Sequence, residues 1–409
     1  KRVYADKTVI IPTDDDSGVN GGQVLVYVAT TVGDLNNGKL YVLRRKDGNK
    51  RETDMVVGNS YPVELVEFPA NYKSLTGAKL DAISDTLKGI KFGRVEDCDA
   101  GKGSVDANRN VYFTVTGQDF TGVNADRSRT RFGRAYRLTL DAASPLSGTL
   151  TCIMDGDNNA LSNPARALYN VDNICVTKDY VYVQEDPNGY PIGALEKQHE
   201  HDARIYQYDI ETGAVKVLME LDHHRTAADS AKFNVSKNAT TGAYEYKKST
   251  IGSWEFGAMI DVSDAIGVPD VFMIAVQPHT WIGAKYKGVD TIVNGGANTR
   301  KNEDQASQII LVKGIPREKV VAGINDKNAE NLFEVYPNPA TGVFNISFEN
   351  NNEATVEVVN ALGQQVYTDR VNGKGKVSKE INLTDLPNGN YFLKLTVDGK
   401  QSQKVITKQ

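Results

Sequence analysis

The chain has 409 residues, a net charge of -5 and an isoelectric point near 5.7. This acidic balance argues against a nucleic-acid partner, and the length exceeds one ordinary hydrophobic core, so two domains are expected. No stretch of sequence approaches the roughly 18 consecutive apolar residues of a membrane-spanning helix. Three cysteines are too few for a disulfide framework, and they leave open one disulfide with a free thiol or three buried thiols.

Residues 1–325 carry the pattern of a domain built almost entirely of β-strands. Short alternating or apolar runs are separated by turn residues, and one short helix is expected at Leu75–Leu87. Several strands carry Tyr-x-Tyr or Tyr-x-Leu, and Arg204–Asp209 runs on into a Thr-Gly turn, a pattern common in β-propeller blades. A β-propeller-like domain is therefore predicted, with a large β-sandwich or lectin-like domain as the alternative.

Carboxylates gather at the ends of the predicted strands of this domain. Asp15 and Asp16 follow the first strand, where successive carboxylates fit either a hard-cation site or a solvated turn. Arg94, Glu96 and Cys98 point to one side of an extended segment, although an Arg–Glu pair is more often a structural ion pair. Each motif alone is a weak signal.

Further acidic motifs occur later in the domain, around Asp172, Glu185 and Glu255. The inner ends of propeller strands face a central channel, so blades that are distant in sequence can each supply a ligand to one site. Carboxylate and amide oxygens suit calcium or magnesium, whereas a thiolate or an imidazole favours iron or zinc. The sequence therefore predicts a shared metal site rather than several separate ones.

These segments resemble the later part of the PhoX-type alkaline phosphatase and esterase-like phytase family. The resemblance is carried by five motifs, namely Arg94-Val95-Glu96-Asp97, Asp172-Asn173-Ile174, Gln184-Glu185-Asp186-Pro187-Asn188-Gly189, Trp254-Glu255-Phe256-Gly257-Ala258-Met259-Ile260-Asp261-Val262 and Val276-Gln277-Pro278-His279-Thr280. It implies a β-propeller that binds calcium and iron in its channel and hydrolyses phosphate esters. It also implies that Arg94 is a catalytic residue that contacts phosphate, and that the metal ligands are Glu96, Asp15 or Asp16, Asp172 and Glu185.

The sequence also departs from that family. The upstream Trp-Gly-Thr-Trp-Leu-x-Cys-Glu-Glu segment, which supplies a cysteine and a glutamate ligand, is absent, and Arg-Pro-Glu reads Arg94-Val95-Glu96. Either the chain lacks its N-terminal part and the site is incomplete, or a divergent propeller kept the scaffold and lost the chemistry. Two hypotheses remain open: a secreted metal-dependent phosphoesterase, and a non-catalytic propeller that binds surfaces or is carried as cargo.

Residues 326–409 have the pattern of a separate, small domain. Turns such as Asn372-Gly373 and Pro387-Asn388-Gly389 separate runs in which apolar and polar residues alternate. The pattern predicts an immunoglobulin-like β-sandwich of six or seven antiparallel strands, with no catalytic residue. The expected strands include Phe344–Phe348, Thr355–Val359, Gln365–Thr368, Lys376–Ile381, Gly389–Val397 and Ser402–Thr407.

An ordered series of short motifs runs through this second domain. It comprises Tyr336, Pro337, Asn338, Pro339 and Gly342 at the start, then Gly363, Gly389 and Tyr391, and Lys404 in the last strand. The series resembles the type A C-terminal sorting domain of proteins secreted by the Bacteroidetes type IX system, although an ordinary accessory module is the alternative. The resemblance implies export through the periplasm and outer membrane, with the translocon, shuttle and sortase components as partners. Such cargo carries a signal peptide and the sequence starts at Lys1, so a processed or truncated chain is expected.

Overall fold

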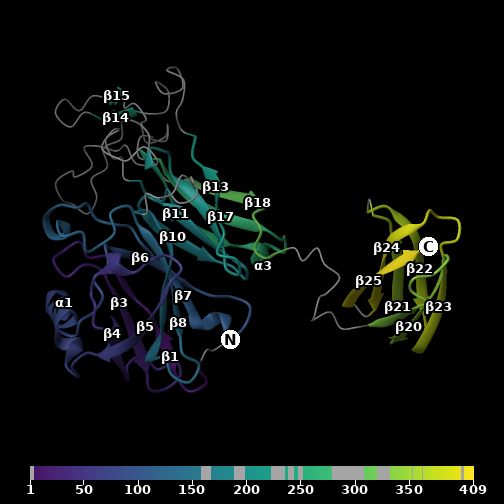
Figure 1. Ribbon diagram of the computed structural model, residues 1–409, viewed down its shortest axis with the longest axis horizontal. Coiled ribbons are helices and arrows are strands. Elements are labelled where there is room, and N and C mark those ends of the chain that lie inside the picture. The colour runs from purple at the N-terminus through teal and green to yellow at the C-terminus, as the bar shows by residue number, and fades with distance from the viewer. Residues whose placement is uncertain are drawn as a thin grey trace. The chain divides into compact units, whose positions relative to one another are not determined.

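The computed structural model describes the chain as two compact units, Lys1–Glu318 and Lys319–Gln409 (Figure 1). Each unit is described by itself below. The described residues are 4–157, 167–187, 199–222, 235–237, 244–246, 252–278, 308–319, 332–351, 353–361, 363–397 and 400–409.

A curled sheet of nine strands forms the first half of the N-terminal unit. Its strands follow the order β1-β3-β4-β5-β9-β8-β7-β6, and β2 pairs with β3. The curl brings the two ends of the sheet together, because the backbones of Gly22 and Phe92 exchange hydrogen bonds of 2.9 and 3.1 Å. The strands are β1 Thr8–Ile10, β2 Thr13–Asp14, β3 Gln23–Ala29, β4 Gly38–Arg45, β5 Ser60–Glu67, β6 Val95–Ala100, β7 Asn110–Val115, β8 Arg134–Leu140 and β9 Ser147–Asp155.

Aromatic and aliphatic side chains fill the inside of the curl. The rings of Phe92, Phe113 and Tyr136 lie 5.2–5.5 Å apart at the centre of this core. The helix α1, Gly77–Thr86, covers another part of the sheet through Leu80 and Ile83, which confirms the short helix expected there. Four single-turn helices lie in the connections: η1 Glu52–Asp54, η2 Tyr72–Ser74, η3 Ala107–Arg109 and η4 Gly122–Asn124.

Three small antiparallel sheets complete the described part of this unit. Strand β10 lies beside β6 and β7 of the curled sheet and also beside β16, so strands of three different sheets are neighbours. The short helix α3, Ser263–Ile266, joins β16 to β17. The sheets are β10 Val171–Val176 with β11 Tyr180–Glu185, β12 Arg204–Asp209 and β13 Val215–Glu220; β14 Val235–Lys237 with β15 Tyr244–Tyr246; and β16 Trp254–Asp261 with β17 Val271–Pro278 and β18 Gln308–Lys313.

The expectation of a mostly β domain is confirmed, but the described residues do not form a closed ring of separate propeller blades. The physical reason is a single strand pairing: Ser60–Glu64 of β5 pairs with Ser147–Thr151 of β9, which merges two successive meanders into one sheet. Residues 223–234, 279–307 and 320–331 lie outside the described parts of the chain.

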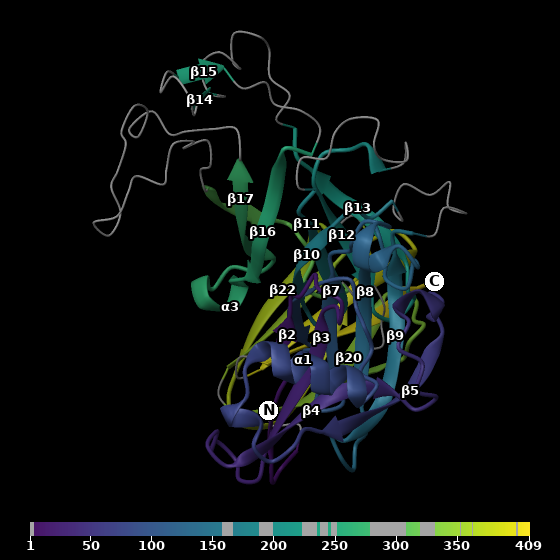
Figure 2. The ribbon, with the colours of Figure 1, turned by 90° about the vertical axis from the view of Figure 1, so that its left-hand side faces the viewer.

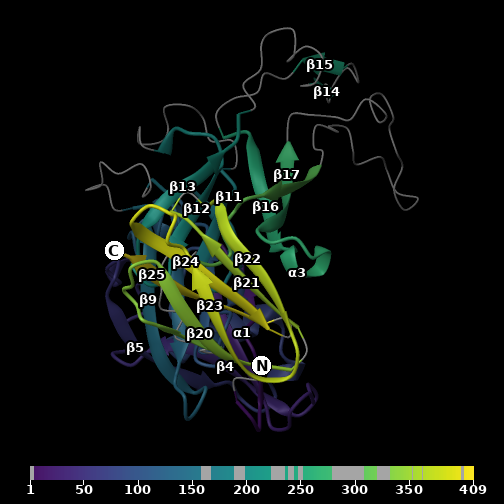
Figure 3. The same cartoon turned by 90° about the vertical axis from the view of Figure 1, so that its right-hand side faces the viewer.

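The C-terminal unit is a sandwich of two antiparallel sheets, as the alternation of its sequence predicted (Figure 3). Both sheets bury one face in a common core that contains Phe344 and Ile346 from one sheet and Val356 and Leu395 from the other. The first sheet has β19 Phe333–Tyr336, β20 Val343–Asn350 and β23 Gly375–Asn382, and the second has β22 Gln365–Asn372, β21 Glu353–Val359, β24 Gly389–Val397 and β25 Lys400–Lys408. Among the described residues of both units, no helix is long and apolar enough to cross a membrane.

Candidate functional site

Four residues that the sequence singled out meet where the curled sheet adjoins β10. Asp15 follows β2, Arg94 precedes β6, Glu96 lies in β6 and Asp172 lies in β10. Strands β2, β10 and β16, which surround this region, are labelled in Figure 2. The group of Asp15, Arg94, Glu96 and Asp172 is called the Arg94 cluster from here on.

The guanidinium of Arg94 organises this cluster. Its Nε and Nη2 donate to the two carboxylate oxygens of Asp15 at 2.8 and 3.1 Å, and Nη2 also donates to Glu96 Oε1 at 2.7 Å. This two-pronged contact is the strongest geometry available to an arginine and a carboxylate. Arg94 has a φ of 74°, in the left-handed region that costs a non-glycine residue conformational energy.

A threonine that the sequence did not single out joins Glu96 to Asp172. Thr116 Oγ1 lies 3.1 Å from Glu96 Oε1 and 3.3 Å from Asp172 Oδ1, so its one hydroxyl proton serves either carboxylate. Asp172 Oδ2 also accepts a hydrogen bond of 3.1 Å from Asn173 Nδ2. The two carboxylates are therefore held near each other by neutral donors rather than by a second cation.

The electrostatics of the cluster show an excess of negative charge. The pKa of Glu96 is raised to about 8, first by burial and then by the charges of Asp172 and Asp15, against the opposing effect of Arg94. Burial also raises the pKa of Asp172, and the next contribution comes from the carboxylate of Glu255. Glu255 belongs to an acidic motif noted in the sequence, and the placement of β16 beside β10 brings its charge near Asp172.

Cys98 does not join Arg94 and Glu96 as the extended pattern predicted. The pairing of β6 with β7 shifts register between Val95 and Cys98, and such a bulge breaks the alternation of sides. The Cys98 thiol donates to Ile11 O at 3.4 Å and packs against the hydrophobic core. Burial raises the pKa of this thiol to about 11, so it stays protonated at neutral pH.

Asp16 lies next to the cluster but faces another group of acids. Its Oδ1 accepts the backbone N–H of Gly18 at 2.9 Å, which is the turn geometry that the sequence left open. Burial raises the pKa of the neighbouring Asp14 to about 6, with contributions from Asp81, Asp16 and Asp15. The structure therefore places Asp15 in the Arg94 cluster and Asp16 on its acidic border.

Glu185 lies outside the Arg94 cluster, in the hydrophobic interior beside β12. Its two oxygens accept the backbone N–H groups of Tyr169 at 2.7 Å and Arg204 at 2.9 Å. His201 Nδ1 lies 3.5 Å away, and burial raises the pKa of Glu185 to about 7. This carboxylate ties together three backbone segments and is not brought to the other predicted ligands.

The residues of the cluster are suitable oxygen donors for calcium, but they are not arranged around one point. In the described part of the chain, no group of three or more His, Cys, Asp or Glu side chains has the geometry of a metal centre. Arg94 lies between Asp15 and Glu96 and pairs with both of them. Iron fits less well, because the described cluster contains neither a thiolate nor an imidazole.

The sorting-motif residues of the C-terminal unit act as structural ties. Asn338 donates to Val405 O at 2.8 Å and accepts from Thr407 N at 2.9 Å, which fastens the segment containing Tyr336, Pro337 and Pro339 to the last strand. The remaining motif positions support turns or cover the core: Gly342, Gly363 and Gly389 have positive φ, Tyr391 donates to Pro387 O at 2.6 Å, and Lys404 lies 5.2 Å from the ring centre of Phe333.

Comparison with known proteins assigns the C-terminal unit. Residues 334–409 match the family model described as secretion system C-terminal sorting domain. None of the curated protein sequences matches the chain. A solved structure titled "Biofilm associated protein - BSP domain" is similar at 8% identity over 99% of this chain and 67% of that chain, with a TM-score of 0.15.

The match establishes how the protein leaves the cell. A C-terminal sorting domain of this family marks the chain as cargo of the type IX secretion system. As cargo, the protein interacts with the secretion machinery and crosses the outer membrane. The protein is therefore secreted or attached to the cell surface. The matched residues include every sorting-motif position predicted from the sequence.

Proposed function

We propose that the exported N-terminal unit binds calcium at the Arg94 cluster. The observation that carries this proposal is the charge balance, because Asp15, Glu96 and Asp172 all act on the guanidinium of Arg94, and the carboxylate of Glu255 adds its charge to that of Asp172. The raised pKa of Glu96 means that protons compete for a carboxylate that would otherwise be ionised. A divalent cation relieves the same repulsion more effectively, and carboxylate oxygens are the ligands that calcium prefers.

Calcium binding requires a local rearrangement of the cluster. The side chain of Asp15 is 43% exposed and that of Arg94 is 30% exposed, so both have room to separate into solvent. Glu96 is 18% exposed and can contribute an oxygen without moving its strand. The exchange replaces one ion pair with metal coordination, which favours a modest affinity.

Hydrolysis of phosphate esters is the second candidate function. It is favoured by one contact, the 2.7 Å hydrogen bond that places a potential phosphate-binding guanidinium beside the predicted metal ligand Glu96. It rests further on the resemblance to PhoX-type phosphatases, in which calcium and iron supply the Lewis acid.

One contact favours a non-catalytic module that binds surfaces or serves only as cargo. The Nε and Nη2 groups of Arg94, which would bind a phosphate, already donate hydrogen bonds to Asp15. Assays with p-nitrophenyl phosphate, in the presence of calcium and iron, separate the two functions. Hydrolysis that falls sharply in Arg94→Lys supports the enzyme, whereas no hydrolysis beside intact calcium binding supports the non-catalytic module.

We also propose that residues 326–409 serve as a removable export signal, recognised by the translocon and shuttle and cut off by the sortase. The match of the family model to residues 334–409 supports this proposal. A chain that ends at residue 325 should accumulate in the periplasm, and the length of the exported protein should show cleavage. Normal export of the shortened chain would contradict the proposal.

The calcium proposal is tested by calorimetric titration of the full chain. We expect a dissociation constant on the order of 0.1–1 mM, as in many extracellular calcium modules. Glu96→Gln and Asp172→Asn should each weaken binding at least about tenfold, because each removes a charged ligand. The matched control is Glu67→Gln, which removes an exposed carboxylate paired with Lys39. Absence of binding at 10 mM calcium (roughly ten times the weakest constant expected for such modules), or equal weakening by the control, would refute the proposal.

A further inference from the structure

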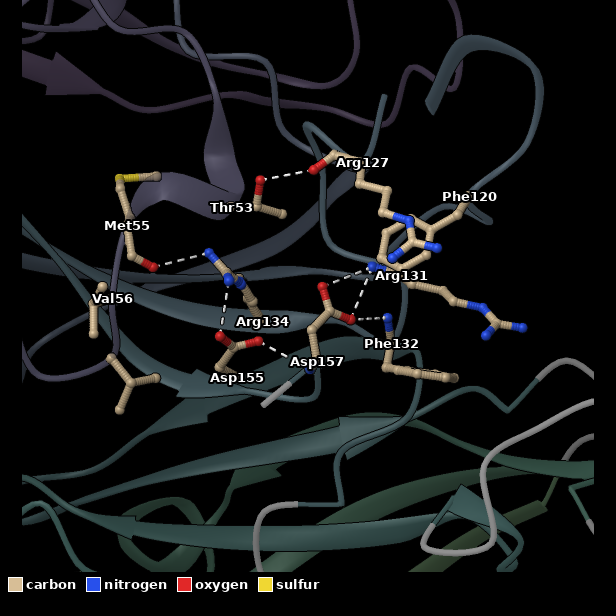
Figure 4. Close-up of a pocket in the computed structure, with 11 residues that line it drawn as sticks. Thr53, Met55, Val56, Phe120, Arg127, Arg131, Phe132, Arg134, Asp155 and Asp157 are labelled. Atoms are coloured by element: carbon tan, nitrogen blue, oxygen red, sulfur yellow. Dashed lines mark hydrogen bonds and ion pairs between the residues drawn. The ribbon is translucent and has the colours of Figure 1, made fainter. Parts of the chain in front are cut away.

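A second concave site lies on the N-terminal unit, independent of the Arg94 cluster and of the proposed calcium binding. It is a cavity of about 540 Å³ between the turn that follows η1, the loop around η4 and the adjoining ends of β8 and β9. Its volume lies in the range of small-molecule sites, roughly 300–1,000 Å³. Figure 4 shows Arg127, Arg131 and Phe120 on one side of it and Met55 and Val56 on the other.

Two arginines on this wall each lie over an aromatic ring. The guanidinium carbon of Arg127 is 5.1 Å from the ring centre of Phe120, and that of Arg131 is 4.7 Å from the ring centre of Phe132. Stacking supports the flat face of a guanidinium and leaves its N–H groups at the edge for an oxyanion. In the described part of the chain, the Arg127 side chain makes no ion pair. Arg131 Nε donates to the exposed carboxylate of Asp119 at 3.3 Å.

The aspartates of the cavity are already engaged, so they do not neutralise these two arginines directly. Asp155 pairs with the buried Arg134 at 2.8 Å. Asp157 accepts the backbone N–H groups of Arg131 and Phe132 at 3.0 and 2.9 Å, which fixes the segment that carries both side chains. Asp155 and Asp157 are thus committed to Arg134 and to the backbone, and the guanidinium of Arg127 supplies positive charge at the wall.

The opposite wall offers apolar surface. Val56 is 58% exposed, and Met55 and Val57 also line the cavity. An exposed valine across the cavity from two arginines suits a ligand that has both a flat apolar body and an anionic end. Phe120 adds apolar surface on the arginine side, beneath Arg127.

We propose that this cavity binds a small aromatic carboxylate. The carboxylate accepts hydrogen bonds from Arg127 and Arg131, and the ring lies against Phe120 and Val56. A planar carboxylate matches the planar guanidinium edge, and the ring replaces water on the apolar wall.

The test is binding of 2-naphthoate to the full chain, measured by calorimetry and by ligand-observed NMR. 2-Naphthylmethanol tests the ring without the carboxylate, and acetate and inorganic phosphate test an anion without the ring. Arg127→Gln and Arg131→Gln should each weaken naphthoate binding about tenfold, the loss expected for one charge-assisted contact. Phe120→Leu should weaken it several-fold, and the control Arg370→Gln, at an exposed arginine of the C-terminal unit, should not.

Three results would overturn this inference. Failure of naphthoate to bind contradicts it directly. Equal binding of acetate or phosphate would show an anion site without a place for the ring, and equal binding of 2-naphthylmethanol would show that the arginines play no part. Because the Arg127 side chain is exposed and lies over the Phe120 ring, without an ion pair among the described residues, its variant should fold normally, and a matched circular dichroism spectrum verifies this.

Discussion

Replacement of Glu96 by glutamine should stabilise the N-terminal unit at alkaline pH in the absence of calcium. The wild-type carboxyl has a raised pKa of about 8 in the folded protein, against an ordinary value of 4.5. A raised pKa contributes stability that is complete below pH 4.5 and is lost as the pH rises through about 8. Glutamine has no proton to lose, so the Glu96→Gln variant keeps its stability over this interval while the wild type declines.

The size of the effect follows from the same two pKa values. The difference between about 8 and 4.5 corresponds to roughly 5 kcal/mol of unfolding free energy above pH 8, if the carboxylate were fully shielded from water. The Glu96 side chain is 18% exposed and its charge is coupled to that of Asp172. Solvent screening and this coupling reduce the expected difference to about 2 kcal/mol. The glutamine oxygen can still accept the hydrogen bond from Arg94, so little is lost in exchange.

Urea unfolding at pH 5, 7 and 9 with a chelator present measures this difference. The variant and the wild type should have nearly equal free energies of unfolding at pH 5, and at pH 9 the variant should be more stable by about 2 kcal/mol. The transition of the C-terminal unit should be unchanged and serves as an internal control. Added calcium should narrow or reverse the difference, because the wild type binds calcium more tightly and gains more stability from it. A variant whose stability at pH 9 is equal to or lower than that of the wild type would refute the reasoning.

Three further outcomes are expected. Gly342→Ala should destabilise the C-terminal unit by about 2 kcal/mol more than Gly373→Ala in urea unfolding, because both have positive φ but only the first would press a Cβ to 2.8 Å from backbone. Glu185→Gln should flatten the decline in stability between pH 4.5 and about 7 that its raised pKa causes, as thermal melts at several pH values will show. Asn338→Ala should lower the melting temperature of the same C-terminal unit by removing two hydrogen bonds to the last strand.

The C-terminal unit could be predicted almost completely because its signals are local. Alternation places Phe344, Ile346 and Phe348 on one face of β20, and all three are buried in the core. Turn residues such as Gly342 and Gly389 mark where the strands end, and both have the positive φ that glycine allows. Neither signal depends on what the rest of the chain does.

The N-terminal unit was harder to predict because its key features are tertiary. The pairing of β5 with β9, which merges two meanders, joins strands about 80 residues apart and leaves no mark in either strand's own pattern. Thr116 could not be foreseen as the link between Glu96 and Asp172, because a threonine in a strand gives no sign of its partners. A bulge in β6 likewise turned Cys98 away from Arg94.

The route of export bears directly on the chemistry proposed for the Arg94 cluster. A cluster in which calcium must displace an arginine from two carboxylates can reach only modest affinity, which would leave it empty where calcium is scarce. Extracellular modules operate with dissociation constants of roughly 0.1–1 mM, because calcium is abundant outside the cell. The sorting domain directs this chain out of the cell. A cluster of such modest affinity would therefore bind calcium only after export, where the calcium concentration is high enough. If calcium binds as proposed, we expect the Arg94–Asp15 pair to hold the cluster together during transport and calcium to replace that pair outside the cell.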